Sequence, residues 1–71
     1  MARDICVAVG ERVRHLRTLR GWRQIDLAQH SGISETYVSH VETGKKELCL
    51  RNLELLAKSF EQTLSQFLDG L

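Results

Sequence analysis

The sequence lacks proline, and no repeat, low-complexity stretch or linker divides its 71 residues. This pattern predicts one small domain spanning residues 1–71. No apolar run approaches the roughly 18 residues needed to cross a membrane, so no membrane partner is expected. The first ten residues include Asp4 and lack the apolar core of a signal peptide, which favours a cytoplasmic protein.

Cysteine is scarce, and its spacing predicts no metal centre. Cys6 and Cys49 are far apart, no C-x-x-C or H-x-x-x-H pattern occurs, and a site shared with the three histidines is the less favoured interpretation. Two buried thiols in a reducing compartment are expected instead. The sequence also contains no nucleophile–base pair and no paired carboxylates. Neither enzymatic activity nor a cofactor is therefore expected.

Charge is nearly balanced overall, at +1, but it is unevenly distributed. Residues 1–23 contain six arginines and two acids, residues 24–43 contain three acids and no Lys or Arg, and residues 44–71 contain four residues of each sign. Basic groups on both sides of the acidic segment would suit contacts with phosphates. An arginine-rich helix face can equally be a solvated surface.

The most informative stretch is Gln24 to Thr43. Two short amphipathic segments, 24–31 and 34–42, are separated by Gly32, which can adopt the positive φ that ends a helix. Because about four residues turn the chain, the spacing predicts a helix-turn-helix, whose second helix, 34–42, can lie in the DNA major groove.

The start of the second helix has a stronger capping signal than the start of the first. Ser34 is a good N-cap, and Ile33 before it can pack against Val38 as a hydrophobic staple. Arg23 is a poor N-cap for the first segment, although Asp26 at the third helical position can reach back to it.

Helical spacing of apolar residues predicts three further helices. The first runs from about residue 4 to residue 19 or 20 and ends at Gly21, and Gly44 ends the helix 34–42. A fourth helix runs from 50 to 60, and Thr63 with Gln66 forms a capping box for a short fifth one. The predicted fold class is all-α, with five helices around one core. The apolar stripe of the first helix consists of Ile5, Val9, Val13, Leu16 and Leu19.

Four segments of the chain carry a family resemblance: GERVRHLR, RGWRQIDLA, SGISETYVSHVETGK and LRNLELLAKSF. Together they resemble the Xre family, the lambda-repressor and Cro-like helix-turn-helix proteins, and the resemblance covers residues 9–68 without a gap. TYVS at 36–39 also resembles the controller proteins of restriction–modification systems. The family often has Ser or Thr at Arg23, Pro at Leu48 and Gly at Glu61. The resemblance also implies a buried ion pair between Arg17 and Glu42.

The outward face of the helix 34–42 supplies the expected base contacts, although any one of these side chains can instead be merely solvated. They are Ser34, Glu35, Thr36, Tyr37, Ser39, His40 and Thr43. Phosphate contacts are expected from residues on either side of the helix 34–42. Gln24 is expected to bind a phosphate because it begins a helix, where backbone N–H groups are exposed, and because the resemblance implies it. The phosphate set is Arg23, Gln24, Lys45, Lys46 and Asn52.

The expected function is that of a dimeric, sequence-specific regulator of transcription on a partly palindromic operator in double-stranded DNA. RNA polymerase is a candidate partner, and repression and activation stay open. The dimer face is expected on surplus apolar residues of the fifth helix, of which Phe67 and Leu68 can alternatively complete the core. The set is Leu64, Phe67, Leu68 and Leu71. The alternative function is a protein-interaction module or antitoxin of the same fold, since the helix 34–42 carries no Lys or Arg.

Overall fold

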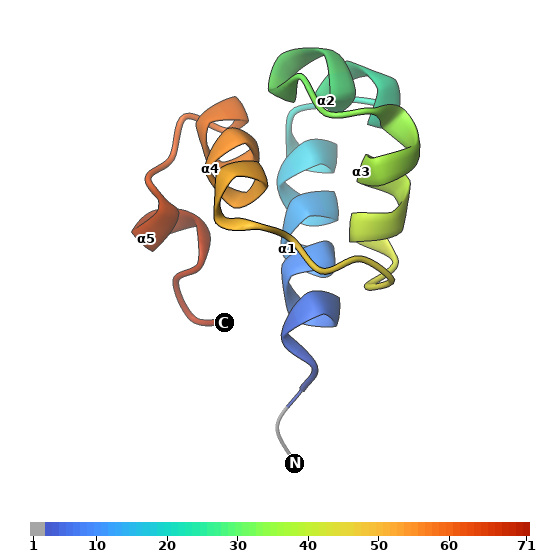
Figure 1. Cartoon of the computed structure of the whole chain (residues 1–71). Coiled ribbons are helices and arrows are strands. Elements are labelled where there is room, and N and C mark those ends of the chain that lie inside the picture. The colour runs from blue at the N-terminus through green and yellow to red at the C-terminus, as the bar shows by residue number, and fades with distance from the viewer. Residues whose placement is uncertain (1–2) are drawn as a thin grey trace.

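The computed structural model describes residues 3–71, so residues 1–2 of the predicted domain lie outside the described part. It contains five helices, as predicted, and the all-α fold class is confirmed (Figure 1). No helix within residues 3–71 is long and apolar enough to span a membrane. The helices are α1 (Ile5–Leu19), α2 (Gln24–Ser31), α3 (Glu35–Glu42), α4 (Leu50–Ser59) and α5 (Leu64–Phe67).

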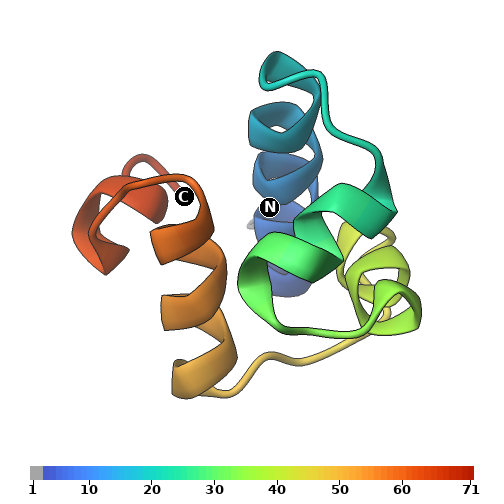
Figure 2. The same cartoon turned by 90° about the horizontal axis from the view of Figure 1, so that it is seen from above.

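A single apolar core joins the five helices. In Figures 1 and 2, α3 lies on one side of α1, α4 and α5 lie on the other, and α2 lies between α3 and α4 and packs against both. Burying one such large apolar side chain contributes roughly 1.5–3 kcal/mol. The largest fully buried side chains come from every helix: Val13, Leu27, Val38, Val41, Leu56 and Phe67.

The turn between α2 and α3 follows the predicted chemistry. Gly32 is the C-cap of α2 and has a φ of 77°, a left-handed conformation that glycine adopts without a steric penalty. Ser34 caps α3, and its hydroxyl oxygen accepts the backbone N–H of Tyr37 at 3.1 Å. The capping box of α5 is also present.

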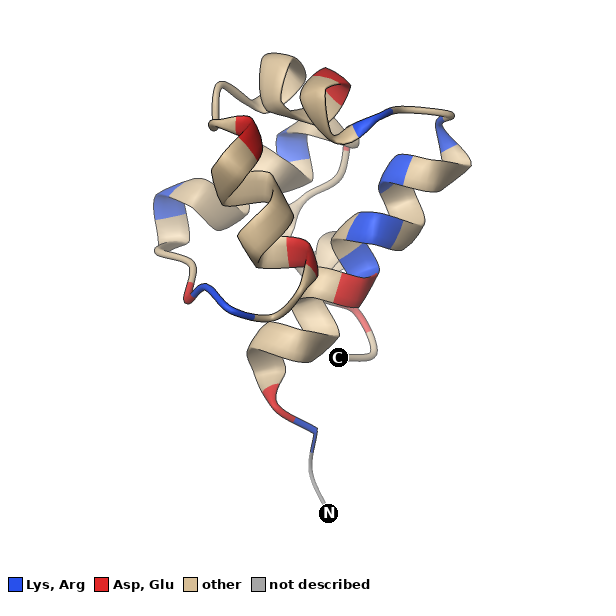
Figure 3. Cartoon of the chain, turned by 90° about the vertical axis from the view of Figure 1, so that its right-hand side faces the viewer, with Lys and Arg blue, Asp and Glu red and all other residues tan. Residues whose placement is uncertain are grey.

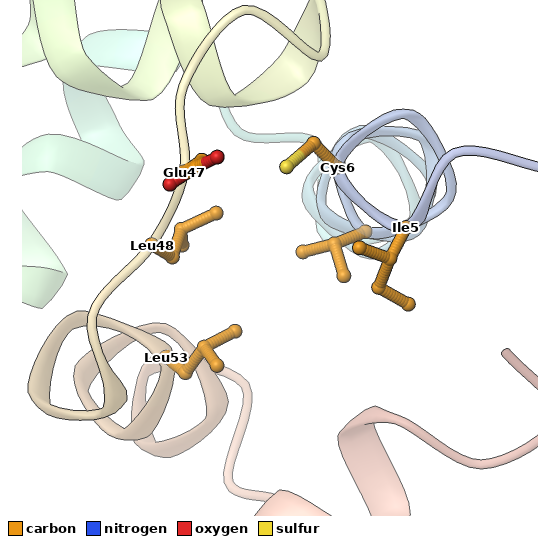
Figure 4. Close-up of a pocket in the computed structure, with 6 residues that line it drawn as sticks. Ile5, Cys6, Glu47, Leu48 and Leu53 are labelled. Atoms are coloured by element: carbon orange, nitrogen blue, oxygen red, sulfur yellow. The ribbon is translucent and has the colours of Figure 1, made fainter.

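Two of the residues predicted for the buried stripe of α1 are exposed. Ile5 is 59% exposed and Leu19 is 69% exposed, because they are the first and last residues of the helix and extend beyond the core. Ile5 instead lines a hollow of about 280 Å³, opposite Leu48 and Leu53 (Figure 4). The stripe prediction is therefore wrong at both ends of α1.

The thiols of Cys6 and Cys49 are not joined to each other. Cys49 is exposed, contrary to the expectation of two buried thiols, because it is the N-cap residue of α4. Cys6 is partly buried in the same hollow. Desolvation, together with the negative charges of Asp4 and Glu47, raises the pKa of the Cys6 thiol, which makes it a poor nucleophile.

Arg12 in α1 and Arg20, the C-cap residue of α1, bind the ends of the C-terminal helices. Arg12 donates to the carbonyl oxygens of Phe67 and Asp69 at 2.7 and 2.8 Å. Arg20 donates to the carbonyl oxygen of Phe60, the C-cap residue of α4, at 2.8 Å. Carbonyls at helix ends have no partner within their own helix, so these contacts satisfy them. Two of the guanidinium groups in residues 1–23 are therefore engaged in hydrogen bonds within the protein.

We expect Glu61→Gly to stabilise the protein. Glu61 follows α4 with a φ of 57° and is the only described non-glycine residue with a positive φ. A side chain in this conformation costs about 1–2 kcal/mol of stability, and glycine removes this cost. The greater freedom of glycine in the unfolded chain offsets about 0.5–1 kcal/mol of the resulting gain in stability. Urea denaturation should therefore show a free energy of unfolding about 0.5–1 kcal/mol higher.

The matched control is Glu61→Ala. It removes the carboxylate, and with it the 3.4 Å contact to Arg20, but it keeps the strained Cβ atom. It should give no comparable stabilisation. Equal stabilisation by both variants would show that backbone strain is not the cause.

Candidate nucleic-acid interface

The inner face of α3 packs on the core, and its outer face is open to solvent. Val38 and Val41 are each 1% exposed. Figure 3 views this side and shows acidic residues on α3, with the basic residues on neighbouring segments. The side chains predicted to read bases all lie on the outer face or its margin. Of these, Ser34, Glu35, Thr36, His40 and Thr43 are exposed, and Tyr37 and Ser39 are partly buried.

Contact between α1 and α3 depends on Gly10, a buried residue in the middle of α1. A Cβ atom at this position would overlap the carbonyl oxygen of Val41 and lie 3.0 Å from that of Glu42. The absence of a side chain therefore sets how closely α3 approaches α1. Sequence reasoning did not find this role, and the isolated glycine within an amphipathic pattern was its only signal.

The predicted ion pair between Arg17 and Glu42 is present. Arg17 Nε donates to Glu42 Oε2 at 2.6 Å, and Arg17 Nη2 donates to Oε1 at 3.0 Å. The two side chains are 12% and 3% exposed. The hydrogen bonds that Arg17 donates to Glu42 raise the pKa of the Arg17 guanidinium, while desolvation opposes that rise. Arg17 Nη1 also donates to the carbonyl oxygen of Trp22, at 2.7 Å, which ties the loop before α2 to the same pair.

Gln24, the first residue of α2, joins this pair. Its side-chain Nε2 donates to Glu42 Oε1 at 3.1 Å, so one carboxylate links α1, α2 and α3. We refer to Arg17, Gln24 and Glu42 as the Glu42 network. The second amide hydrogen of Gln24, and the backbone N–H groups that a helix start leaves unbonded, can donate to an anion. The network thus places a predicted phosphate contact at the edge of the α3 face.

On the opposite edge, the loop after α3 carries Lys45 and Lys46, both exposed. The N–H of Lys45 donates to the carbonyl oxygen of His40 at 3.0 Å, in a Schellman-type end with Gly44 where it was predicted. Tyr37 anchors the loop, since its hydroxyl donates to the carbonyl oxygen of Glu47 at 3.3 Å and Lys46 Nζ lies 5.8 Å from its ring centroid. Tyr37 therefore helps to position the basic loop.

Internal bonds occupy some of the predicted contact groups. The hydroxyl of Ser34 caps α3, and the hydroxyl of Thr43 lies 3.2 and 3.1 Å from the carbonyl oxygens of Ser39 and His40. Asn52 lies in the first turn of α4, beyond the basic loop, and is partly buried. Exposed side chains without a capping role in α3 are best placed to reach a ligand, and these are Glu35, Thr36 and His40.

Arg23 is already paired within the protein. Its Nε and Nη2 donate to the two carboxylate oxygens of Asp26 at 3.1 and 3.0 Å, and its backbone N–H donates to Asp26 Oδ2 at 2.7 Å. These bonds lower the pKa of the Asp26 carboxyl and raise that of the Arg23 guanidinium. Five of the six arginines in residues 3–23 are thus engaged internally: Arg3, Arg12, Arg17, Arg20 and Arg23.

The predicted dimer face needs one correction. Phe67 is 0% exposed, because its ring completes the core beside Phe60, so it has no surface to offer a partner. Leu64 and Leu68 are partly buried, and Leu71 is 43% exposed. This face lies on the side of the molecule away from α3 (Figure 1).

Residues of α4 extend the apolar face beyond the prediction. Leu50 is 77% exposed, and a hollow of about 490 Å³ lies between α4 and α5. Leu50 stands at the predicted start of the fourth helix; it is the first residue of α4 and lies outside the core. The hollow is lined by Leu50, Arg51, Glu54, Leu55 and Leu64.

The five-helix fold, with α3 exposed after a glycine turn, defines a helix-turn-helix protein. Residues 8–69 match the family described as "Helix-turn-helix domain", and the chain belongs to this family. Over 58 residues the chain is 40% identical to the competence pilus inhibition repressor of Acinetobacter baylyi, covering 82% of the chain and 53% of that protein. The chain therefore spans about half the length of this relative.

Two solved controller proteins have the same fold. The restriction–modification controller C.AhdI of Aeromonas hydrophila has a TM-score of 0.83 and 35% identity, over 87% of this chain and 94% of that one. The controller C.Esp1396I, solved as a tetramer in complex with its natural 35 base-pair operator, has a TM-score of 0.83 and 29% identity. That match covers 93% of this chain and 87% of the controller. The resemblance to controller proteins inferred from the sequence is confirmed.

We expect Arg17→Met to destabilise the domain strongly. Removing one partner of a buried ion pair leaves an uncompensated charge and costs on the order of 3–5 kcal/mol, enough to unfold a domain of this size. Thermal unfolding followed by circular dichroism measures the loss. The matched control is Arg3→Met, which breaks an exposed pair with Glu11 and should leave the melting temperature nearly unchanged. An unchanged melting temperature for Arg17→Met would contradict the structural role of the pair.

Proposed function

We propose that this protein is a sequence-specific DNA-binding regulator of transcription that inserts α3 into the major groove. The observation that carries the proposal is the position of α3, whose exposed face lies between the N-terminus of α2 and the loop with Lys45 and Lys46. An α-helix fits the major groove of B-DNA, and flanking donors can then reach the phosphates of both strands. The repressor and controller relatives, one of them solved on its operator, support this function.

Within this proposal, base reading and backbone binding are separate tasks. Glu35 can accept the N4 amino hydrogen of cytosine, Thr36 can contact the methyl group of thymine, and His40 can bond a base edge. The remaining predicted base contacts, at Ser34, Tyr37, Ser39 and Thr43, are secondary because their polar groups or surfaces are partly engaged internally. Phosphates are bound by Gln24, Lys45, Lys46 and Asn52, and by Arg23 when it is released from Asp26.

We also propose that the protein acts in the cytoplasm as a homodimer. Because α4 and α5 lie opposite α3, a two-fold axis near Leu50, Leu64 and Leu71 would leave both copies of α3 free. Two such helices about 34 Å apart match successive major grooves and require a partly palindromic operator. The bound dimer could repress by blocking a promoter or activate by contacting RNA polymerase.

The second candidate function is a protein-interaction module, such as an antitoxin, with weak or no DNA binding. The observation that favours it is the internal use of five arginines, together with the absence of Lys and Arg from α3. Lys45 and Lys46, which lie exposed beside α3, favour the DNA-binding function. Binding experiments at controlled salt separate the two.

We expect selection of bound duplexes from random DNA, at 50 and 200 mM salt, to enrich a two-fold symmetric motif. Half-sites should lie about 10 base pairs apart, centre to centre. The Lys45→Ala/Lys46→Ala variant is the control and should recover the same motif at low salt only, because phosphate contacts carry the salt dependence. No enrichment at low salt would favour the interaction module.

We further expect Lys46→Ala and Glu35→Ala to have different effects. Lys46→Ala should weaken binding to all duplexes alike and flatten the salt dependence by at most about one unit of slope. Glu35→Ala should leave the slope unchanged and relax discrimination by roughly 1–3 kcal/mol at one base pair. Titrations with operator and mismatched duplexes measure both effects. The reverse pattern would mean that the reading and binding roles are exchanged.

A further inference from the structure

Asp26 lies in the first turn of α2, the helix that begins with the predicted phosphate contact Gln24. It is the third residue of α2, and its carboxylate accepts three bonds from Arg23, one from the backbone N–H and two from the guanidinium. The N-terminus of a helix favours an anion, and in the free protein a carboxylate of the chain itself fills that place. The Asp26 side chain is only 26% exposed, whereas that of Arg23 is 78% exposed and reaches toward solvent.

A phosphate approaching Gln24 therefore meets an N-terminus that already carries a negative charge. While paired, the Arg23 guanidinium has its charge offset by Asp26 and its Nε–Nη2 edge occupied, so it can offer that edge and its full charge to a phosphate only if it leaves Asp26. When it does, Asp26 loses a partner and attracts a cation from solution, which reduces the net release of counterions from the complex. Glu35 adds a second negative charge near Arg23, from the start of α3.

We infer that Asp26 is an internal competitor of the DNA backbone, which limits DNA affinity by occupying Arg23 in the free protein. This inference rests on the proposed function and adds a residue that was not among the predicted contacts. Asp26 touches no base, so its effect is the same for every DNA sequence. It provides one reason why a chain with six arginines in residues 1–23 can bind DNA without binding all DNA tightly.

A double-mutant cycle with Asp26→Asn and Arg23→Gln tests this inference. Asn keeps a side-chain oxygen that can cap the start of α2, so circular dichroism should show unchanged helix content. Binding is measured on two duplexes of equal length, one selected and one random, at several salt concentrations. Asp69→Asn is the matched control, since it removes an exposed acid near the C-terminus of the chain.

We expect Asp26→Asn to tighten binding to both duplexes by about twofold to fivefold, which is the range for an exposed ion pair, and to steepen the salt dependence. In the Arg23→Gln background, Asp26→Asn should give a clearly smaller gain, because only the direct repulsion between the carboxylate and the phosphate remains to be removed. Asp69→Asn should have little effect in either background.

An equal gain in both backgrounds would overturn the inference, because it would mean that Asp26 acts only through its overall charge. An absence of any gain would overturn it as well. If Asp26→Asn reduces helix content, the inference is tested instead by the NMR resonance of the Arg23 Nε–H in the unmodified protein. This resonance should shift on addition of the duplex. An unchanged resonance would mean that the Arg23–Asp26 pair persists in the complex, and would overturn the inference. Failure of the unmodified protein to bind either duplex at low salt would instead overturn the proposed function, and this inference with it.

Discussion

The carboxylate of Glu42 is the point on which the position of α3 depends. It is nearly inaccessible to water, so its charge needs compensation, and Arg17 supplies two bonds and Gln24 a third. These partners belong to α1 and α2, so the last residue of α3 is bound to both neighbouring helices. Gly10 permits the backbones of α1 and α3 to approach closely enough for these bonds to form. The orientation of the exposed α3 face follows from this buried network.

The basic side chains fall into two groups, one that stabilises the fold and one that is free to bind a ligand. Arginines in α1 and at its C-cap bind helix ends and compensate a buried acid, whereas Lys45 and Lys46 lie on an exposed loop held by Tyr37. A net charge of +1 therefore conceals a local arrangement in which few cations are available to phosphates. Affinity for DNA would then be moderate and sensitive to salt, and specificity would rest on neutral and acidic groups of α3.

Local chemistry made much of the fold predictable. Gly32 and Ser34 have conformational and capping preferences that depend on few neighbours, so both ends of the turn were placed correctly. The Arg17–Glu42 pair came from the family resemblance, because periodicity alone cannot match partners 25 residues apart. Gly10, the exposure of Leu19 and the burial of Phe67 depend on tertiary packing, which a hydrophobic pattern does not specify. For Arg23 and Asp26, the sequence predicted the bond from the Arg23 backbone N–H to the Asp26 side chain. It did not predict the bonds from the Arg23 guanidinium.

The most direct test is an NMR titration of the isotope-labelled protein with a selected duplex, followed through its backbone amide resonances. If α3 enters the major groove in the orientation fixed by the Glu42 network, the largest chemical-shift changes should fall on residues 23–24 and 34–46. Amides at the buried centre of α1 and in the last turns of α4 should change little. Shifts confined to α4 and α5, or no shifts at low salt, would contradict DNA recognition by α3.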